Sequence, residues 1–373
     1  MTTLFEPVKI NGMAVPNRFV RSATYDGCAD TSGHVTDAQV ALFEQLAAGG
    51  TGLIVTGIAY VHDSGQISAY QNSIADDDAI AGLKRLTDAV HKKGARIAVQ
   101  LFHAGREAAG FLKTRNRQAA GPSVVAEDPY FQRPYRAMTE DEIYEIIAAF
   151  GDAAQRARKA GFDAVQLHAA HAYLPAQFLS PHVNRRQDAW GGSLENRLRL
   201  HREIYENIRE KVCRDYPVLV KLGVADGFDG GLEFDEGKQA AQLLAQWGFD
   251  SLEISSGLRG KRYSETEFKT GVRGREKEAY FRDWCRQVRG LVNVPVMMVG
   301  GLRSPDLMAE IVANHEADMI SLSRPLIREP GIIGTWRSGE RKAPDCISCN
   351  KCLEALYKGQ QLHCAQQKSR TEG

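Results

Sequence analysis

The amino-acid sequence predicts an α/β protein, a (β/α)8 TIM barrel that carries long loops after strands 3 and 6 and a cysteine-rich C-terminal extension. Its 373 residues are 43% hydrophobic and 25% charged, which is ordinary for a globular protein. Eight short apolar segments alternate with segments of helical periodicity, and such alternation predicts parallel strands. Eight strand–helix units are enough to close the sheet into a barrel.

The eight strand candidates are short and mostly apolar on both faces, as expected of strands with helices outside and a packed interior. They are Arg18–Ser22, Gly52–Thr56, Arg96–Leu101, Ala164–Leu167, Val218–Leu222, Ser251–Ile254, Val296–Val299 and Met319–Ser321.

Four helices are predicted between these strands. Residues Asp78–Lys93 and Asn196–Val212 carry apolar side chains at helical spacing. Thr139 followed by Glu142 is typical of a capping box, so a helix is expected to begin there. Residues Asp306–Ala313 follow a proline, which is favoured in the first turn of a helix.

Two long connections leave the carboxyl ends of the strands, where loops usually shape a substrate pocket. They are Gly105–Met138 after the third strand and Ser255–Tyr280 after the sixth. The composition then changes near the end of the chain, becoming polar and rich in cysteine. We therefore expect residues 1–335 to form the barrel and residues 336–373 to form an extension packed on it.

The charge and hydropathy patterns exclude several classes of partner. The formal net charge is +1, so neither a nucleic-acid partner nor an anionic membrane partner is expected. No apolar stretch approaches the roughly 20 residues that a bilayer-spanning helix needs, and residues 1–16 do not resemble a signal peptide. We expect a cytoplasmic protein that acts on a small molecule.

Candidate catalytic residues follow the strand Ala164–Leu167. His168, His171 and Tyr173 come within six residues of one another at the rim where barrel enzymes carry out catalysis. Imidazole N–H groups can hold a carbonyl or nitro oxygen, and a phenol can deliver a proton. The alternative is two solvated loop histidines and a core tyrosine.

From Leu4 to about Pro330 the sequence resembles the old yellow enzyme family of FMN-dependent oxidoreductases. The segments that carry the resemblance are Asn17–Phe19, Gln100–Arg106, His168–Leu174 and, most specifically, Gln177–Pro181 continuing through Asn184–Arg186 to Trp190–Arg197.

The resemblance implies a barrel with FMN bound non-covalently at the carboxyl rim, and it implies the following contacts, residue by residue. Ala23 and Thr24 would lie along the flavin ring, Gly57 would approach it, Gln100 would bond its pyrimidine edge, and Lys221 would face N1 and O2. The phosphate would be held by Gly300, Gly301, Ser323 and Arg324. Tyr25 stands where many relatives carry a Thr or Cys that tunes the flavin, and Lys221 stands where Arg is common.

The resemblance also implies a reaction. His168 and His171 would hold the oxygen of an α,β-unsaturated carbonyl or acyl compound, flavin N5 would give a hydride, and Tyr173 would give a proton. This is the chemistry of an ene-reductase, with NAD(P)H as the expected electron donor and a homo-oligomer as the expected assembly.

Four cysteines near the end of the chain form a separate motif, Cys346-x2-Cys349-x2-Cys352 followed by Cys364 after eleven residues. In a reducing compartment such a cluster points to a metal rather than to disulfides. The spacing is similar to that around the 4Fe-4S cluster of trimethylamine dehydrogenase and, less closely, of 2,4-dienoyl-CoA reductase. Structural zinc and uncoordinated thiols are the alternatives. Cys28, Cys213 and Cys285 are expected to be buried small residues.

Those two relatives have a long additional C-terminal portion that binds a second nucleotide. The sequence ends at Gly373, so we expect that portion to be absent, and with it an internal route from NAD(P)H through FAD. One alternative function is therefore a flavin and iron–sulfur subunit of a multi-chain reductase, or of an amine dehydrogenase-like enzyme, that exchanges electrons with a partner protein. Oxidative demethylation itself is less favoured, because an amine cation prefers an aromatic cage or a carboxylate to two donors. A non-catalytic flavin-binding protein is the remaining alternative.

Overall fold

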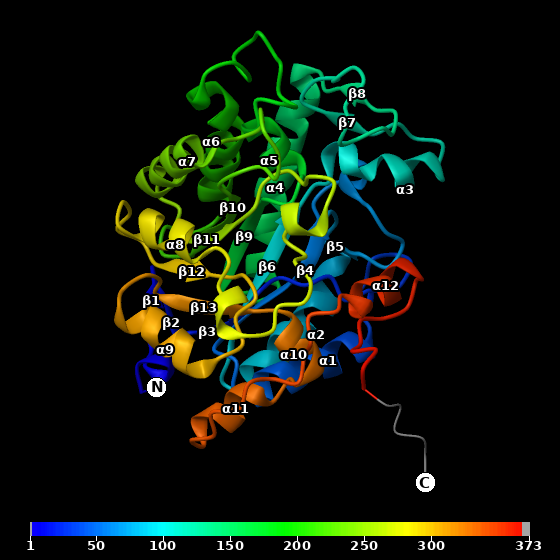
Figure 1. Ribbon diagram of the computed structural model, residues 1–373. Coiled ribbons are helices and arrows are strands. Elements are labelled where there is room, and N and C mark those ends of the chain that lie inside the picture. Colours follow the sequence, from blue (N-terminus) through cyan, green and yellow to red (C-terminus); the bar gives the residue numbers. More distant parts are fainter. Residues whose placement is uncertain (1, 368–373) are drawn as a thin grey trace.

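Eight parallel strands close into a barrel in the computed structural model, which describes residues 2–367. The hydrogen-bonded order is β3-β13-β12-β11-β10-β9-β6-β4, and pairing of β3 with β4 completes the circle (Figure 1). The predicted (β/α)8 TIM barrel is confirmed, and each predicted strand matches one observed strand. The strands are β3 (Phe19–Arg21), β4 (Leu53–Tyr60), β6 (Arg96–Phe102), β9 (Ala164–Ala169), β10 (Val218–Gly223), β11 (Ser251–Ser255), β12 (Val296–Met298) and β13 (Met319–Leu322).

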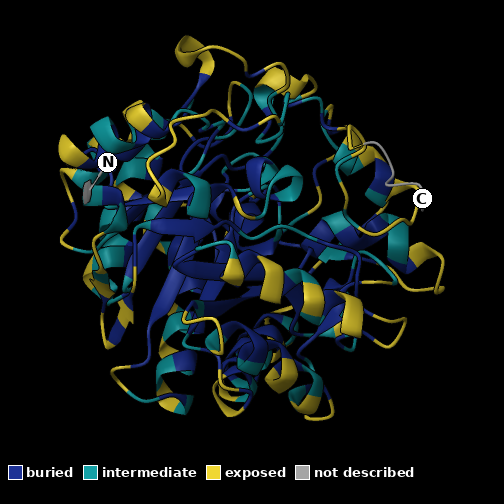
Figure 2. Cartoon of the chain, turned by 90° about the horizontal axis from the view of Figure 1, so that it is seen from below, coloured by how far each residue is buried: buried dark blue, intermediate teal, exposed yellow. Residues whose placement is uncertain are grey.

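Helices surround the barrel and expose residues on their outer faces, whereas the barrel strands are buried (Figure 2). The predicted capping box is present: the Glu142 amide donates to Thr139 Oγ1 (3.3 Å), and the Thr139 amide donates to the Glu142 carboxylate (2.9 Å). The surrounding helices are α1 (Asp37–Ala48), α2 (Ala79–His91), α4 (Glu140–Lys159), α6 (Leu194–Lys211), α7 (Phe234–Trp247), α8 (Arg282–Arg289), α9 (Pro305–Ala313) and α11 (Ile332–Arg337).

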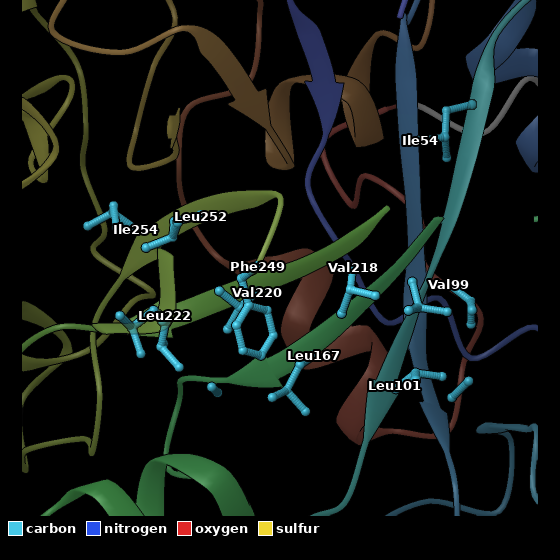
Figure 3. Close-up of a cluster of buried hydrophobic side chains, with 14 of the residues drawn as sticks. Ile54, Val99, Leu101, Leu167, Val218, Val220, Leu222, Phe249, Leu252 and Ile254 are labelled. Atoms are coloured by element: carbon cyan, nitrogen blue, oxygen red, sulfur yellow. The ribbon is translucent and has the colours of Figure 1, made fainter. Parts of the chain in front are cut away.

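The hydrophobic core has two parts, because successive side chains of a strand point to opposite faces. Outward-facing side chains of the strands pack against the helices, among them Val99, Leu167, Val220 and Ile254 (Figure 3). Inward-facing side chains at the amino ends of the strands form a second cluster. An antiparallel hairpin of β1 (Val8–Ile10) and β2 (Met13–Val15) packs onto this second cluster and plugs that end of the barrel.

The two long connections contain short elements that the sequence did not predict, because two- and three-residue segments have no measurable periodicity. Residues 105–138 hold η3 (Gly105–Ala108), α3 (Ala109–Lys113), β7 (Ala120–Gly121) and β8 (Arg136–Ala137); residues 255–280 hold η4 (Tyr263–Glu265) and η5 (Arg275–Lys277). The remaining short elements are η1 (Thr2–Phe5), η2 (Asp63–Gly65), β5 (Asn72–Ser73), α5 (Leu174–Leu179), α10 (Arg324–Arg328) and α12 (Lys351–Tyr357).

The residues after α11 return to the carboxyl ends of the strands. The Arg303 guanidinium, which follows β12, donates to the carbonyls of Pro344 (2.8 Å) and Cys346. The Leu362 amide donates to the carbonyl of Asp26, just after β3 (2.8 Å). These contacts hold the cysteine-rich segment against the rim of the barrel. No helix within residues 2–367 is long and apolar enough to cross a bilayer.

Candidate active site

A layer of polar side chains lies inside the barrel toward the carboxyl ends of the strands. On β6 the inward position changes from Ala98 to Gln100, and on β10 it changes from Leu219 to Lys221. Glu253 on β11 is the register partner of Lys221 and is also buried. The amino half of the interior is therefore an apolar plug, and the carboxyl half is a polar floor.

This floor is a continuous hydrogen-bond network. Gln100 Nε2 donates to Gln166 Oε1 (2.8 Å), and Gln166 Nε2 donates to Glu253 Oε2 (3.1 Å). Lys221 Nζ lies 3.3 Å from Glu253 Oε1 and donates to Ser22 Oγ (2.8 Å), which itself donates to Glu253 (2.6 Å). A buried carboxylate thus neutralises a buried ammonium and fixes its position, as buried charges require. The sequence indicated Gln100 and Lys221 but missed Gln166, Glu253 and Ser22.

The three candidate catalytic residues come together at the end of β9. The His168 ring centroid lies 5.0 Å from that of His171 and 4.9 Å from that of Tyr173, with near-perpendicular planes in both cases. Phe102, at the end of β6, packs edge-on against Tyr173 at 4.4 Å. The solvated-loop alternative is inconsistent with this placement, since His168 is buried and the three rings touch.

A strained turn at His171 and Ala172 orients the side chains that follow β9. His171 and Ala172 both have left-handed backbone angles, with φ of +58° and +66°. Such angles cost roughly 1–2 kcal/mol per non-glycine residue and persist where surrounding structure enforces them. Here the amides of His171 and Ala172 donate to the carbonyls of Ser256 and Gly257 (3.1 Å each), so the loop after β11 holds the turn.

Both imidazoles are neutral at ordinary pH. Burial is the main cause that holds the pKa of His168 and of His171 well below the usual value, and the nearby positive charges act in the same direction. His171 Nε2 lies 2.8 Å from Ser255 Oγ. His168 Nδ1 is buried and has no hydrogen-bond partner among residues 2–367. Because buried polar atoms are almost always paired, this nitrogen indicates a place for a ligand atom.

Tyr173 is a protonated phenol at neutral pH, because burial raises its pKa. The guanidinium of Arg259, in the loop after β11, opposes that rise; its Cζ lies 5.4 Å from the centroid of the Tyr173 ring. Arg259 and its partner Glu267 were not predicted, because they lie in an irregular loop without a periodic pattern. A protonated phenol beside neutral imidazoles can serve as a proton donor.

A cavity of about 960 Å³, including its open mouth, begins at this floor and runs along the rim. Of the predicted site residues, those that line it are Ala23, Thr24, His171, Lys221, Gly300, Gly301, Ser323 and Arg324.

Four of the residues that line this cavity fit a phosphate-bearing group: Gly300, Gly301, Arg303 and Arg324. Gly300 and Gly301 have φ of +126° and +74°, and a Cβ at Gly301 would lie 2.8 Å from the Tyr280 ring, so the turn requires glycine. Arg324 and Arg303 bring two cations to the same wall. Together with Lys221, which lines the same cavity, the donor set fits an anionic ligand such as FMN. Arg303 was missed, although it lies only two residues after Gly301.

The other predicted flavin contacts lie beside the cavity rather than in its wall. Tyr25 shares a hydrogen bond with Ser68 (Oη to Oγ, 2.7 Å), which fixes its phenol. A Cβ at Gly57 would lie 2.9 Å from the carbonyl oxygen of Thr24, so this glycine allows β4 to approach the segment after β3. Gln100 lies in the polar floor.

The structure brings the four C-terminal cysteines together. Cys346, Cys349, Cys352 and Cys364 line one cavity of about 340 Å³, whose wall they share with Arg324, Ile327 and Asn350. Cys346, Cys352, Arg324, Ile327 and Asn350 also line the larger cavity, so the two cavities adjoin. Arg328 Nη1 and Gln366 Nε2 each lie 3.9 Å from a sulfur, those of Cys364 and Cys349 respectively.

The sulfurs are not arranged around a single ion. Within residues 2–367, no three or more His, Cys, Asp or Glu side chains lie close enough to hold one metal ion. Of the remaining cysteines, Cys28 and Cys285 are buried, as predicted, whereas Cys213 is half-buried.

Comparison with known proteins identifies similar sequences. The model of the NADH:flavin oxidoreductase / NADH oxidase family matches residues 3–342. An NADH oxidase of Thermoanaerobacter brockii is 35% identical over 353 residues, which cover 93% of this chain and 52% of that protein. An NADPH dehydrogenase of Halalkalibacterium halodurans is 35% identical over 328 residues, which cover 88% of this chain and 91% of that protein.

Similar solved structures include longer proteins. A 2-naphthoyl-CoA reductase bound to 2-naphthoyl-CoA superposes with a TM-score of 0.87 at 27% identity, covering 97% of this chain and 56% of that one. Histamine dehydrogenase from Rhizobium sp. 4-9 superposes with a TM-score of 0.84 at 28% identity, covering 98% of this chain and 52% of that one. The chain thus spans about half the length of both structures and of the Thermoanaerobacter protein.

Proposed function

The chain belongs to the NADH:flavin oxidoreductase / NADH oxidase family, and from that premise we propose that it is an FMN-dependent NAD(P)H oxidoreductase of the old yellow enzyme type. The proposed reaction reduces the activated C=C bond of an α,β-unsaturated carbonyl or acyl compound. One observation carries the proposal: a protonated Tyr173 and two neutral imidazoles meet beside a cavity lined by the residues expected to hold FMN, and one buried nitrogen of His168 has no partner among the described residues.

The proposed FMN site lies in the large cavity. Ala23, Thr24 and Lys221 would contact the ring, with Tyr25, Gly57 and Gln100 beside them; Gly300, Gly301, Ser323 and Arg324 would hold the phosphate. Lys221 is held in place by Glu253 and Ser22, so its charge would be presented in a fixed position. These residues would hold FMN, which when bound would supply the hydride that the β-carbon of the substrate needs.

His168 and His171 would act on the oxygen that activates the substrate. As neutral imidazoles, each has one N–H to donate, and donors that point at a developing negative charge stabilise it. The fixed turn at His171–Ala172 means that little reorganisation is needed when the charge forms. The two residues would therefore stabilise the enolate that forms from the substrate more than they stabilise the unreacted substrate.

Tyr173 would complete the reduction. Its hydroxyl proton passes to the α-carbon, so the substrate gains one hydride and one proton in all, and the C=C bond becomes a single bond. The phenolate that remains recovers its proton from solvent. Similarity to a protein named 2-naphthoyl-CoA reductase supports acyl compounds as a substrate class.

A second candidate is a subunit that passes electrons to or from a partner protein, as in an amine dehydrogenase-like enzyme or a multi-chain reductase. The observation that favours it is the cavity lined by Cys346, Cys349, Cys352 and Cys364, which adjoins the flavin cavity. We propose that these thiolates hold a 4Fe-4S cluster, which supplies one-electron transfer when present. Similarity to histamine dehydrogenase is consistent with this candidate.

The variant Tyr173→Phe tests the leading proposal. The Phe102 and His168 rings pack against the Tyr173 ring, so the phenylalanine should keep its place. We expect normal FMN content and normal reduction by NAD(P)H, measured anaerobically by flavin bleaching. Reoxidation by an enone or enoyl thioester should slow by about 10²–10⁴-fold, the usual contribution of a general acid. Reoxidation at the parent rate would exclude Tyr173 as the proton donor.

The second candidate has its own test. Protein purified without oxygen is assayed for iron and sulfide, and turnover is compared with NAD(P)H alone and with an artificial one-electron acceptor. Iron with sulfide, and turnover that depends on the acceptor, would support the electron-transfer subunit. Full enone reduction by NAD(P)H in protein without iron would exclude a required cluster.

A further inference from the structure

Arg259 is held rigidly over the proposed proton donor. Its Nε lies 2.9 and 3.1 Å from the two carboxylate oxygens of Glu267, and its Nη2 lies 2.7 Å from Oε1 of the same side chain. The Glu267 side chain is only 7% exposed, so water competes weakly for this ion pair. The guanidinium carbon lies 5.4 Å from the centroid of the Tyr173 ring, within the range of a cation–π contact.

The other charged and titratable groups around Tyr173 come from the elements packed against it. Glu107, in η3, approaches Arg259 Nη1 at 3.9 Å. Glu267 Oε1 also lies 3.9 Å from His171 Nδ1. His168 lies against the Tyr173 ring, and its pKa and that of His171 are both well below the usual value, so these imidazoles carry no charge. Among the groups named here, Arg259 is therefore the one that presents a positive charge to the Tyr173 phenol.

A cation in this position affects the two states of the phenol differently. When Tyr173 loses its proton, the negative charge is attracted by the guanidinium, whereas the neutral phenol is not. The attraction lowers the pKa of Tyr173, against the effect of burial and of Glu267 and Glu107, which raise it. Burial alone would leave a phenol too weakly acidic to donate well, because a general acid works best when its pKa is near the working pH.

We propose that Arg259 is a positioning residue for the proton donor: Glu267 fixes its guanidinium over Tyr173, where its charge stabilises the phenolate that remains after proton transfer. This inference rests on the proposed function, in which Tyr173 protonates the α-carbon. It adds a residue of the 255–280 loop, far in sequence from β9, to the machinery of that step.

The geometry favours this role over direct binding of an anionic substrate. The Nε and Nη2 edge of the guanidinium, which could hold a carboxylate bidentately, is already occupied by Glu267. The Nη1 group faces Glu107, and a second carboxylate there would repel an incoming anion. Substrate binding by Arg259 is accordingly the competing outcome of the test.

The test compares Arg259→Gln with Arg259→Lys in the FMN-loaded protein. Arg262→Gln is the matched control, because Arg262 belongs to the same loop but is 78% exposed and pairs with Glu265. In Arg259→Gln we expect substrate-driven flavin reoxidation to slow roughly ten- to hundredfold, with KM nearly unchanged. The alkaline limb of the pH profile should move to higher pH, because the phenol becomes a weaker acid. Arg259→Lys should recover part of both effects.

A measurement without turnover accompanies the kinetics. Carbon-13 labelling of the tyrosine Cζ atoms allows the ionisation of Tyr173 to be followed by NMR, with its signal assigned from Tyr173→Phe. The midpoint should lie at higher pH in Arg259→Gln than in the parent or in Arg262→Gln. An unchanged midpoint would overturn the inference.

Failure of the proposed function and failure of the proposed role of Arg259 give different results. If Tyr173→Phe reduces substrates as fast as the parent, the proposed function of Tyr173 fails. If Tyr173→Phe is slow but Arg259→Gln keeps the parent rate and pH profile, only the role of Arg259 fails. A rise in KM with kcat unchanged would likewise overturn the role and assign Arg259 to substrate binding.

Discussion

Removing the two imidazoles together should weaken the binding of an anionic oxygen beside the flavin. The perturbation is His168→Ala combined with His171→Ala, in a protein that has been loaded with FMN. The two ring centroids are 5.0 Å apart, so both rings can contact one ligand oxygen, and the buried His168 Nδ1, which has no partner among the residues that the structure describes, is available for such a contact.

The magnitude follows from the number and kind of bonds lost. A hydrogen bond to a charged group contributes about 1.5–3 kcal/mol, so two bonds to a phenolate contribute about 3–6 kcal/mol. This corresponds to a loss of roughly 10²–10⁴ in affinity. Because the pKa of both histidines is well below the usual value, they stay neutral, and the loss should not depend on imidazole titration above about pH 6.5.

The assay is titration with a para-substituted phenol, followed by the long-wavelength charge-transfer absorption that a phenolate gives over oxidised flavin. His168→Asn with His171→Asn is the matched control, since an amide keeps an N–H donor and should recover part of the affinity. FMN content should stay the same in both variants. An unchanged charge-transfer titration in the double alanine variant would refute the proposed role of the pair.

Three further predictions concern other parts of the molecule. His201→Leu should raise the free energy of unfolding by about 1–3 kcal/mol at pH 7, because both ring nitrogens of the buried His201 lack partners among residues 2–367. Burial lowers the His201 pKa to about 3, so as the pH falls below about 6.5 the unfolded parent takes up a proton that the folded parent does not. The free energy of unfolding of the parent, measured with urea, should therefore fall by up to about 1.4 kcal/mol per pH unit below about pH 6.5. That of the variant should fall less. Gly301→Ala should weaken FMN binding, measured by fluorescence titration, because the added Cβ would lie 2.8 Å from an aromatic ring at a residue with a left-handed φ. Gly331→Ala should leave FMN binding unchanged, because the space around Gly331 is open. Cys364→Ser should lose anaerobically assayed iron while keeping FMN, and Cys213→Ser, outside the cysteine cavity, should keep both; equal iron in the two variants would contradict the proposed cluster.

The barrel was predictable because strands buried on both faces are apolar runs, and eight such runs alternate with amphipathic segments. Thr139 and Glu142 marked a helix start through a contact between near neighbours in sequence. The hairpin of β1 and β2 was not predicted, because each strand has three residues and its purpose, to plug the barrel, depends on the closed fold.

The site was only partly predictable for a related reason. His168, His171 and Tyr173 lie close together in sequence, so the strand end that carries them also brings them together in space. Glu253 lies within an apolar run, and only barrel closure shows that it points inward to Lys221. Arg259 was missed because its place over Tyr173 depends on the path of an irregular loop.

The proposal as a whole depends on a flavin at the carboxyl rim of the barrel. The most direct measurement is an absorption spectrum of the purified protein before and after incubation with FMN and removal of the excess. We predict a yellow protein that retains one FMN per chain and is bleached anaerobically by NADH or NADPH. A colourless protein that takes up no FMN would contradict the account.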